Sequence, residues 1–391
     1  MKKYIIIAIL LSLGIPILTK ADMGMIPVWP PDVNLQESNQ NAIAAWNGEE
    51  EILILSTDIT ADQEGASVLR IIPLPDNPTK VDEAKFESFE KLVEIMNQKL
   101  SDLRETGFGG KNITAPQGGE PAAVITFHKK IGAHDINVVK INNLDEFLKW
   151  EQLKDLGIKE LQITNEFRSA LENYMARNIT YFAFDKIEVG KEKISVTPIS
   201  YHFKSDYLYY PIKLTAFSAT AEKEQSINDE VHLFAITKNS IDDPENIFSH
   251  RYPKWNRNPS LKFDKEELKS VSEDLSNLFN SEAYVTEIGY VGGLYNIQED
   301  IIIYSSTLWQ KNFTIGSKGK DVLALQSILI NEGLWNSKVA ATGYFGSITK
   351  QAVIKFQEKY PSYILAPWKL TKGTGFVGPY TRQFLNQFQM Q

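Results

Sequence analysis

GYFGSITKQ at residues 343–351 returns as GFVGPYTRQ at residues 375–383. Both copies carry a glycine, an aromatic residue and a second glycine, followed by threonine, a basic residue and glutamine at the same spacing. Each copy predicts a helix start, with Gly346 or Gly378 at the N-cap and Pro379 at the first helical position, where its missing N–H needs no partner. Because apolar residues then recur at helical spacing, the repeat predicts two helices that begin in the same way.

A third helix is predicted before the repeat. Residues 321–330, DVLALQSILI, have the same amphipathic character, and Gly333 follows as a helix stop. Three short helices can bury a core only by packing on one another, because so small a unit has little apolar surface to remove from water. The sequence from residue 313 onward therefore predicts a compact three-helix unit.

The same residues carry a resemblance to a known family. Over residues 313–389 the unit is similar to the peptidoglycan-binding-like domain of bacterial wall enzymes. The resemblance implies a three-helix module that binds cell-wall peptidoglycan and is attached to other domains. The long aromatic segment 360–372 departs from the family pattern and can alter any groove between the second and third helices. The matching segments are GSKG (316–319), DV (321–322), LQ (325–326), TGYFG (342–346), AV (352–353), FQ (356–357) and 375–386.

Candidate ligand-binding residues lie mainly at the two predicted helix starts. Helix N-termini offer unpaired backbone N–H groups and partial positive charge, which suit the carboxylates of a wall peptide. Aromatic side chains offer flat faces to sugar rings. The competing interpretation is structural, with glycines in turns, threonines as caps and aromatic residues in the core. The candidates are Tyr344, Gly346, Thr349, Trp368, Gly378, Thr381 and Arg382.

Charge divides the chain at the same place. The whole chain has a net charge of −8, whereas residues 313–391 carry nine basic and three acidic residues, a net +6. Residues 22–312 carry −17, because the first 21 residues contribute three lysines. A basic unit on an acidic body favours an anionic polymer, such as wall peptide or teichoic acid, as the partner of that unit. The acidic body argues against nucleic-acid binding.

The first 21 residues predict a secretory signal peptide. Lys2 and Lys3 precede an apolar run over residues 5–18, and Ala21 is a small residue at the expected cleavage site. The run is short for a membrane span, so membrane attachment is expected only if the segment is retained. The chain has no cysteine, which excludes disulfides, lipidation on cysteine and thiolate metal sites. The expected location is secreted or periplasmic, in association with the cell wall.

The body predicts a mixed α and β structure in two parts, 22–141 and 142–310, so that the whole chain is an α+β protein of several domains. Asn47-Gly48 predicts a hairpin turn between two apolar strands, and Asn143 with Glu146 has a capping-box pattern. Further strands are predicted at 180–187, 194–203, 207–217, 231–237, 283–288 and 301–304, and helices at 82–103, 144–155, 164–177 and 265–279.

The body also resembles a widespread family of secreted prokaryotic proteins with a domain of unknown function. The resemblance rests on DMGMIP at 22–27, NAIAAWNG at 41–48 running into EILILS at 51–56, and YYPIKL at 209–214. No activity is assigned to that family, so this resemblance implies no reaction.

The body shows no recognisable catalytic motif. His128 and His134 flank a predicted turn, where they could share one metal ion, but no metal-binding spacing supports the pair. His202 and His232 fit half-buried strand positions. No Gly-x-Ser-x-Gly elbow occurs, and GFGGK at 107–111 lacks the spacing of a phosphate-binding loop. Acidic residues are plentiful, so a pair for glycan hydrolysis stays open although none is identified. We expect no metal and no cofactor.

We therefore expect a secreted, non-catalytic, cell-wall-associated protein that binds peptidoglycan through its C-terminal unit, with a body that contacts an unknown protein partner. One alternative is a cell-wall hydrolase whose catalytic acidic residues lie in the body. Another is a structural interaction protein whose C-terminal unit no longer binds the wall. An enzyme requires converging carboxylates or histidines in the body, whereas a binding module requires an open groove near Tyr344, Thr349 and Arg382.

Overall fold

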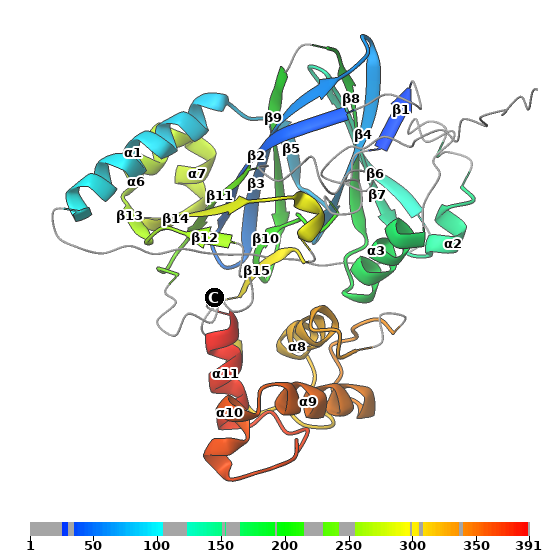
Figure 1. Ribbon diagram of the computed structural model, residues 1–391, viewed down its shortest axis with the longest axis vertical. Helices are drawn as coiled ribbons and strands as arrows, with labels where there is room; N and C mark the ends of the chain where they lie inside the picture. The colour runs from blue at the N-terminus through cyan, green and yellow to red at the C-terminus, as the bar shows by residue number, and fades with distance from the viewer. Residues whose placement is uncertain are drawn as a thin grey trace, which may run out of the picture.

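Figure 1 shows the computed structural model of the chain, in which a body of layered sheets and helices carries a smaller helical module at one end. The expected signal peptide, residues 1–21, and the glycine-rich loop at 107–111 lie outside the residues that the structure describes. None of the helices in the described part is long and apolar enough to cross a membrane. The described residues are 26–29, 35–104, 123–150, 153, 165–191, 194–214, 230–241, 255–297, 299–304, 308–335 and 339–389.

Two sheets form the centre of the body. In sheet A all neighbouring strands are antiparallel, and in sheet B only β2 and β11 run parallel. Sheet A has the order β1 (Ile26–Trp29), β4 (Ala66–Leu74), β8 (Tyr181–Val189), β7 (His134–Ile141) and β6 (Ala123–Ile131). Sheet B has the order β12 (Trp255–Arg257), β14 (Ala283–Val291), β11 (Glu230–Thr237), β2 (Leu35–Trp46), β3 (Glu50–Ala61), β9 (Ile194–Lys204) and β5 (Lys80–Glu83), with β13 (Leu261–Phe263) beside β14.

Alternating side chains give sheet B two buried faces. In β2, Ala42 and Ala44 belong to the core that is shared with sheet A, whereas Ile43 and Ala45 belong to a second core on the opposite face. The sequence AIAAW at residues 42–46 is apolar without interruption because both faces of the strand are covered. The second core is closed by α1 (Phe86–Arg104), α6 (Lys265–Val271) and α7 (Glu273–Leu278).

The outer face of sheet A is covered in the same way. Leu144 and Phe147 of α2 (Leu144–Phe147) and Tyr174 of α3 (Asn165–Ala176) pack against its apolar side chains. The body therefore has four layers, in the order helices, sheet B, sheet A, helices (Figure 1). This arrangement confirms the expected mixture of strands and helices.

Each sheet takes strands from both sides of residue 142. β4 pairs with β8 in sheet A, and β2 pairs with β11 in sheet B. The expected parts 22–141 and 142–310 therefore do not form separate sheets, because these pairings join segments that are far apart in sequence. Two local predictions agree with the structure. Gly48 lies in the turn of the β2–β3 hairpin with a positive φ of 101°. The Asn143 side chain accepts a hydrogen bond from the Glu146 N–H.

Three main helices make up the C-terminal module, as the repeat predicts. They are α8 (Lys320–Asn331), α9 (Ser347–Lys359) and α11 (Pro379–Gln389). The repeat copies lie at the starts of α9 and α11, and Gly346 is the N-cap of α9. Between these two helices, α10 (Pro361–Ile364) and the 3-10 turn η4 (Ala366–Trp368) form an insertion.

A buried glutamine holds each copy of the repeat. The Gln326 amide of α8 donates to the Tyr344 carbonyl and the Thr349 hydroxyl, at 2.8 and 2.9 Å, and its oxygen accepts from the N–H groups of Thr342 and Gly343. Four hydrogen bonds from one side chain thus tie a helix to the loop that starts the next helix. We call this set the first glutamine clasp.

The second clasp repeats the first one helix later. The Gln357 amide of α9 donates to the Phe376 carbonyl and the Thr381 hydroxyl, at 2.9 and 3.1 Å, and its oxygen accepts from the N–H groups of Thr374 and Gly375. The conserved spacing of the two copies within this chain therefore reflects the same loop built twice. The threonines bind the glutamines, and they do not cap the helices as the structural interpretation expected.

The two glycines of each copy have different tasks. Gly343 and Gly375 have φ of 68° and 71°, a region that favours glycine. At Gly378 an added Cβ would lie 2.7 Å from the Phe376 ring, so this glycine leaves room for the aromatic side chain to fold over it. At Gly346 the corresponding distance to the Tyr344 ring is 3.5 Å. The first glycine therefore has a conformational cause in both loops, whereas a steric cause for the second glycine is found at Gly378 and not at Gly346, where 3.5 Å is an ordinary contact.

The module is joined to the body by a packed connection. The small sheet of β10 (Tyr207–Tyr210) and β15 (Ile301–Tyr304) leads into η3 (Leu308–Gln310), where Trp309 is buried in the core that extends from the body into the module. Ala341 of the module donates its N–H to the Ala176 carbonyl at the end of α3, at 2.7 Å. The 3-10 turn η2 (Leu294–Asn296) precedes β15. Body and module therefore share buried apolar and hydrogen-bonded contacts.

Glu51 is a buried acid beside this connection. Its Oε2 accepts the Tyr209 N–H at 2.7 Å, and its Oε1 has no hydrogen-bond partner among the described residues. Burial raises the pKa of Glu51 well above its usual value, and the hydrogen bond from Tyr209 offsets only part of that effect. The folded protein therefore holds a proton on Glu51 at pH values where the unfolded chain releases it.

We predict that Gln357→Leu destabilises the protein by roughly 3 kcal/mol, because it leaves buried N–H and carbonyl groups of the second clasp without partners. Chemical denaturation of the full chain, followed by fluorescence and circular dichroism, measures the change. Gln351→Leu is the matched control, since Gln351 is exposed on the same helix. Equal unfolding curves for Gln357→Leu and Gln351→Leu would contradict the assigned role of the clasp.

We also predict that Glu51 makes the free energy of unfolding fall as pH rises above the usual pKa of glutamate. The unfolded chain loses the Glu51 proton there while the folded chain keeps it. Rising pH therefore stabilises the unfolded state relative to the folded state. Glu51→Gln, which cannot ionise, should flatten this part of the pH–stability curve, whereas Glu50→Gln at the exposed neighbouring position should not. Parallel curves for the wild type and Glu51→Gln would show that burial does not perturb this acid.

Candidate functional site

One extended segment connects the two repeat loops. Residues 313–319 run between them: Phe313 and Val377 exchange two backbone hydrogen bonds at 2.9 and 3.2 Å. Further along, the Gly316 N–H donates to the Phe345 carbonyl at 3.0 Å, and the Phe345 N–H donates to the Ser317 carbonyl at 2.9 Å. The segment 313–319 and the two loops therefore form one continuous surface layer over the starts of α9 and α11.

Large apolar side chains are exposed on this layer. Ile315, Tyr344, Ile348 and Phe376 are between 42% and 53% exposed, although such side chains usually lie inside a protein. The Lys318 ammonium group lies 5.4 Å from the centre of the Tyr344 ring, a cation–π distance. We call Ile315, Lys318, Tyr344, Ile348 and Phe376 the motif face. Several large apolar side chains exposed on one surface layer are typical of a site of interaction.

Five of the seven predicted site residues lie on the motif face, directly beneath it or in the interior of the module. Tyr344 lies on the motif face, and Gly346 and Gly378 lie beneath the Tyr344 and Phe376 rings. Thr349 and Thr381 are inside the module, with exposures of 1% and 4%, and their hydroxyl groups bind the clasp glutamines. The threonines thus hold the loops that carry the motif face, while their own side chains do not reach its surface.

The other two predicted residues lie away from the motif face. Arg382 binds the connection to the body: its guanidinium donates to the carbonyls of Trp309 and Gln310 and to the Asn312 side chain, at 2.8 to 3.2 Å. Trp368 belongs to the insertion and is 55% exposed, with its ring edge-to-face against Tyr380. Arg382 therefore stabilises the position of the module, and Trp368 is available on a second surface.

Four residues of the motif face were not among the site residues predicted from the sequence. Phe376 could have been predicted from the sequence, because it takes the same place in the second copy of the repeat as Tyr344 takes in the first. Ile315 and Lys318 had no such signal, since only the pairing of the segment 313–319 with the loops brings them into this layer. Ile348 lies in the first copy of the repeat, where its helical spacing indicated only the apolar side of a helix. The layer also covers two helix starts, whose partial positive charge adds to that of Lys318.

His128 and His134, which were considered as a pair for one metal ion, have different partners in the structure. His134 is fully buried, with Nδ1 about 2.9 Å from an oxygen of Asp185 and Nε2 at 3.0 Å from the Thr197 carbonyl, while His128 is exposed and contacts Asp135. The pair considered for one shared metal is therefore engaged elsewhere. Across the described ranges, no group of three histidine or acidic side chains is placed to hold a metal ion.

Asp185 is the centre of a buried polar cluster between the two sheets. Arg70 of β4 donates to Asp185 of β8 at 2.7 Å, and both side chains are almost fully buried. Burial alone would raise the pKa of Asp185, but the Arg70 guanidinium and the His134 ring outweigh burial and hold the pKa below its usual value. The cluster is thus a satisfied ion pair inside the sandwich.

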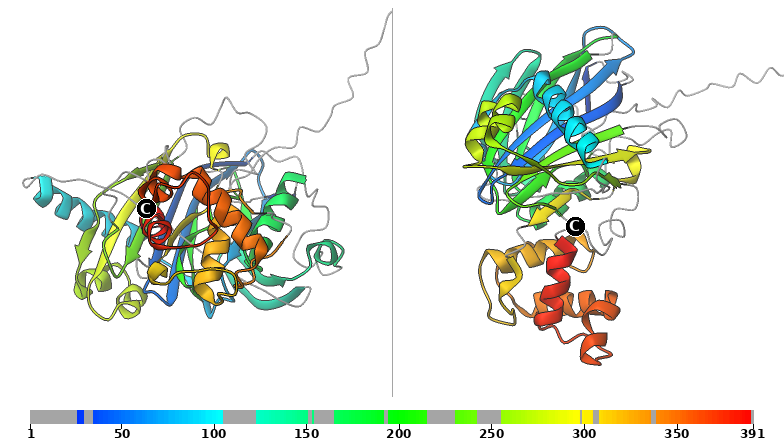
Figure 2. Two further views of the ribbon diagram at one scale, coloured as in Figure 1. Left: turned by 90° about the horizontal axis from the view of Figure 1, so that it is seen from below. Right: turned by 90° about the vertical axis from the view of Figure 1, so that its left-hand side faces the viewer.

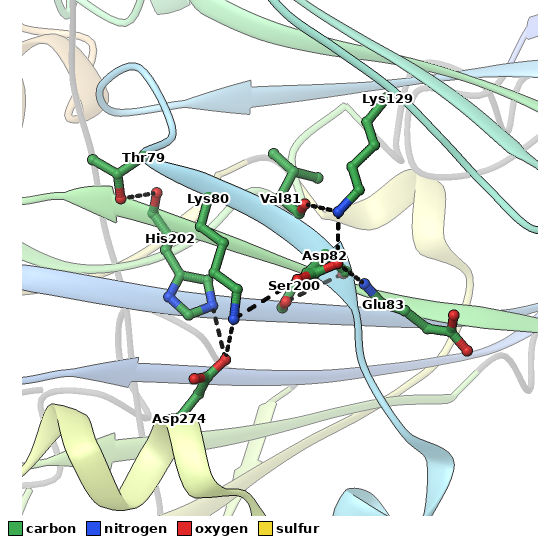
Figure 3. Close-up of polar contacts among 9 residues, drawn as sticks. All are labelled: Thr79, Lys80, Val81, Asp82, Glu83, Lys129, Ser200, His202 and Asp274. Carbon is green, nitrogen blue, oxygen red and sulfur yellow. Dashed lines mark hydrogen bonds and ion pairs between the residues drawn. The ribbon is translucent and has the colours of Figure 1, made fainter.

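A second ionic network lies at the end of sheet B (Figure 3). Lys129 of β6 binds Asp82 of β5 at 2.6 Å, and Lys80 binds Asp274 of α7 at 2.6 Å. The hydrogen bond from Lys129 lowers the pKa of Asp82, whereas burial and the Lys80 charge lower the pKa of His202. A general acid for glycan cleavage needs a raised pKa. The lowered pKa of Asp82 does not suit this role.

A third cluster joins α3 to β15. Tyr174 donates to Asp300 at 2.6 Å and Arg177 donates to it at 2.7 Å, all in the interior. The adjacent Lys213 donates to the Asn173 side chain at 2.9 Å. Burial, together with the Arg177 charge, lowers the pKa of Lys213 to about 8. In each of these three clusters the acidic groups pair with basic groups, which indicates a structural role.

Comparison with known proteins agrees with this division of the chain. Residues 21–290 match the family described as "Uncharacterized protein conserved in bacteria (DUF2330)". Residues 318–360 match the family described as "Putative peptidoglycan binding domain". This second match covers α8, α9 and the first copy of the repeat, and it ends before the insertion and the second copy.

Solved structures add little. Baculovirus P35 is similar at 13% identity, with 72% of this chain and 100% of P35 covered and a TM-score of 0.36. The caspase-8/P35 complex contains a chain similar at 12% identity, with coverages of 67% and 94% and a TM-score of 0.32. At such TM-scores the likeness supports no conclusion about this chain.

No curated protein matches the chain. The match over residues 21–290 spans more than half of the sequence and covers nearly all of the two sheets and the helices that pack on them. The match over residues 318–360 includes the first clasp and three of the five residues of the motif face. The chain therefore belongs to the DUF2330 family of bacterial proteins and carries a C-terminal peptidoglycan-binding domain.

Proposed function

We propose that this protein is exported to the cell envelope and binds peptidoglycan through the motif face, without hydrolysing it. The observation that carries the proposal is the exposed Tyr344 ring with Lys318 beside it, held in place by the first glutamine clasp within the residues of the wall-binding match. An exposed aromatic ring next to a fixed cation suits a ligand that has both apolar faces and negative charge.

Peptidoglycan has both of these features. Its sugar rings present C–H groups to an aromatic face, and its peptide stems carry carboxylates. The module has a net charge of +6, and the starts of α9 and α11 lie beneath the motif face. Attraction of the carboxylates to Lys318 and to the helix starts therefore supplements the contact with Tyr344 and Phe376.

The predicted residues then have distinct roles. Tyr344 contacts the ligand, and Gly378 leaves room for the Phe376 ring to lie against it, while Gly346 contacts the Tyr344 ring. Thr349 and Thr381 position the loops through the clasps. Arg382 holds the module against its connection to the body. Replacing a threonine tests the fold of the module, whereas replacing Tyr344 or Lys318 tests the contact itself.

The body has a separate role in this proposal. The acidic residues of its three described clusters pair with lysine, arginine or histidine, and Glu51 is fully buried in the body. These observations favour a body that binds a partner protein over one that cleaves glycan. The net charge of −17 over residues 22–312 favours a partner with a basic surface.

We predict that the double variant Tyr344→Ala, Lys318→Ala binds purified sacculi about tenfold more weakly than the wild type, the loss typical of an aromatic contact residue together with its cation. Sedimentation of the full chain with sacculi measures the affinity. Phe86→Ala is the matched control, because Phe86 is a partly exposed aromatic residue of the body. The thermal midpoint should be similar in all three proteins.

Release of soluble wall fragments is followed in the same samples. Release by the wild type would establish hydrolysis and overturn the non-catalytic proposal. Wild-type protein that stays in the supernatant would favour the alternative in which the module serves only as a scaffold. Unchanged binding of the double variant would remove the motif face as the binding site.

A further inference from the structure

The insertion between α9 and α11 is a second exposed surface of unusual composition. Residues 359–391 contain four basic residues and no acidic residue. Each residue from 366 to 372, APWKLTK, is exposed, so the apolar side chains of Trp368 and Leu370 lie in solvent on either side of Lys369, with Lys372 close behind in the sequence. The insertion begins where the wall-binding match ends, at residue 360. It lies at the end of the module that points away from the body (Figures 1 and 2).

The insertion is firmly anchored. Ile364 and Leu365 are buried in the core, and the Tyr363 ring stacks on Phe384 of α11 with centroids 5.1 Å apart. The turn is closed by its backbone, since the N–H of Leu370 donates to the Leu365 carbonyl at 3.1 Å. These contacts fix the exposed side chains before any ligand arrives, which lowers the entropic cost of binding.

Lys369 takes a position that favours glycine. Its φ of 56° is left-handed, and it follows η4 where a helical turn commonly ends in glycine. Its N–H donates to the Ala366 carbonyl at 2.9 Å, which completes the Schellman arrangement of the turn. A non-glycine residue there costs stability. The chain thus keeps a positive charge next to Trp368 at a place where glycine would fit with less strain.

Trp368 and Tyr380 form an aromatic corner. Their ring centroids are 5.3 Å apart and their planes meet at 83°, so Tyr380 supports the indole from one side while much of Trp368 is open to solvent. Tyr380 is the second residue of α11, within the second copy of the repeat. The corner is therefore tied to the same helix start that lies under the motif face.

We infer that Trp368, with Lys369, Lys372 and Tyr380, is a subsite for the glycan strand of peptidoglycan, distinct from the motif face. This inference rests on the proposed function. A sugar ring has one face of C–H groups that packs on an open indole, and a rim of hydroxyl groups that stays in water. The lysines match the lactyl carboxylates that muramic acid residues carry wherever the stem peptide is absent, as on the peptide-free strands used below.

A lipid surface fits the insertion less well. Membrane-surface binding uses a long amphipathic helix whose apolar face enters the headgroup region. Here α10 has four residues, and the Tyr363 and Trp368 rings rest on Phe384 and Tyr380 and so are held close to the module. The flat, supported rings favour stacking on a ring-shaped ligand.

The test compares three substitutions of Trp368 in the full chain. The probes are intact sacculi, glycan strands from which an amidase has removed the peptides, and vesicles of anionic phospholipid. Trp368→Ala and Trp368→Leu should each weaken binding to the peptide-free strands about tenfold, while Trp368→Phe should keep most of it because it retains a flat ring. Tyr344→Ala should reduce binding to intact sacculi. Circular dichroism and the thermal midpoint verify that each variant is folded.

The outcomes separate the two proposals. If the wild type binds sacculi but not peptide-free strands, or if Trp368→Leu binds the strands as well as Trp368→Phe, the glycan subsite is wrong while the proposed function stands. Binding to vesicles that Trp368→Ala abolishes, without binding to strands, would also overturn the subsite and indicate a membrane contact. If the wild type binds neither sacculi nor strands, the proposed function itself fails.

Discussion

Two buried glutamines determine the shape of the C-terminal module. Gln326 and Gln357 each satisfy four backbone or hydroxyl groups of the loop that begins the next helix. Buried amide and carbonyl groups without partners cost stability, so the loops cannot move away from the helices that hold them. The position of the exposed aromatic rings follows from this constraint, since Tyr344 and Phe376 belong to the clasped loops. The surface that we propose for wall binding thus depends on residues that never touch the wall.

The body is stabilised differently, by two sheets that share one core and by helices that cover their outer faces. Some buried polar groups form matched sets, such as Arg70 with Asp185 and His134, whereas Glu51 is buried with one carboxylate oxygen left without a partner among the described residues. The same apolar core continues through Trp309 into the module, so the body and the module are joined by buried contacts. The body and the motif face therefore belong to one folded unit.

Local features of the sequence predicted much of this structure. The repeat indicated two matching helix starts because its glycines and proline act within a few positions, through a positive φ at glycine or through proline at the first helical turn. Local sequence patterns could not predict the four-layer arrangement of the body, because the pairing of β2 with β11 joins segments about 190 residues apart. The site shows the same limit. Tyr344 was selected from the sequence, but Lys318 comes beside it only through backbone pairing, and the Thr349 hydroxyl turns inward because Gln326 of another helix binds it.

The most direct test of the account is hydrogen–deuterium exchange of the full chain, measured by mass spectrometry with and without soluble peptidoglycan fragments. The account predicts slower exchange in the segment 313–319 and in the loops that precede α9 and α11, with little change across sheets A and B. Those amides lie in the layer that carries the motif face. Slower exchange confined to the body, with the module unchanged, would show that the wall ligand binds elsewhere and would contradict the central claim.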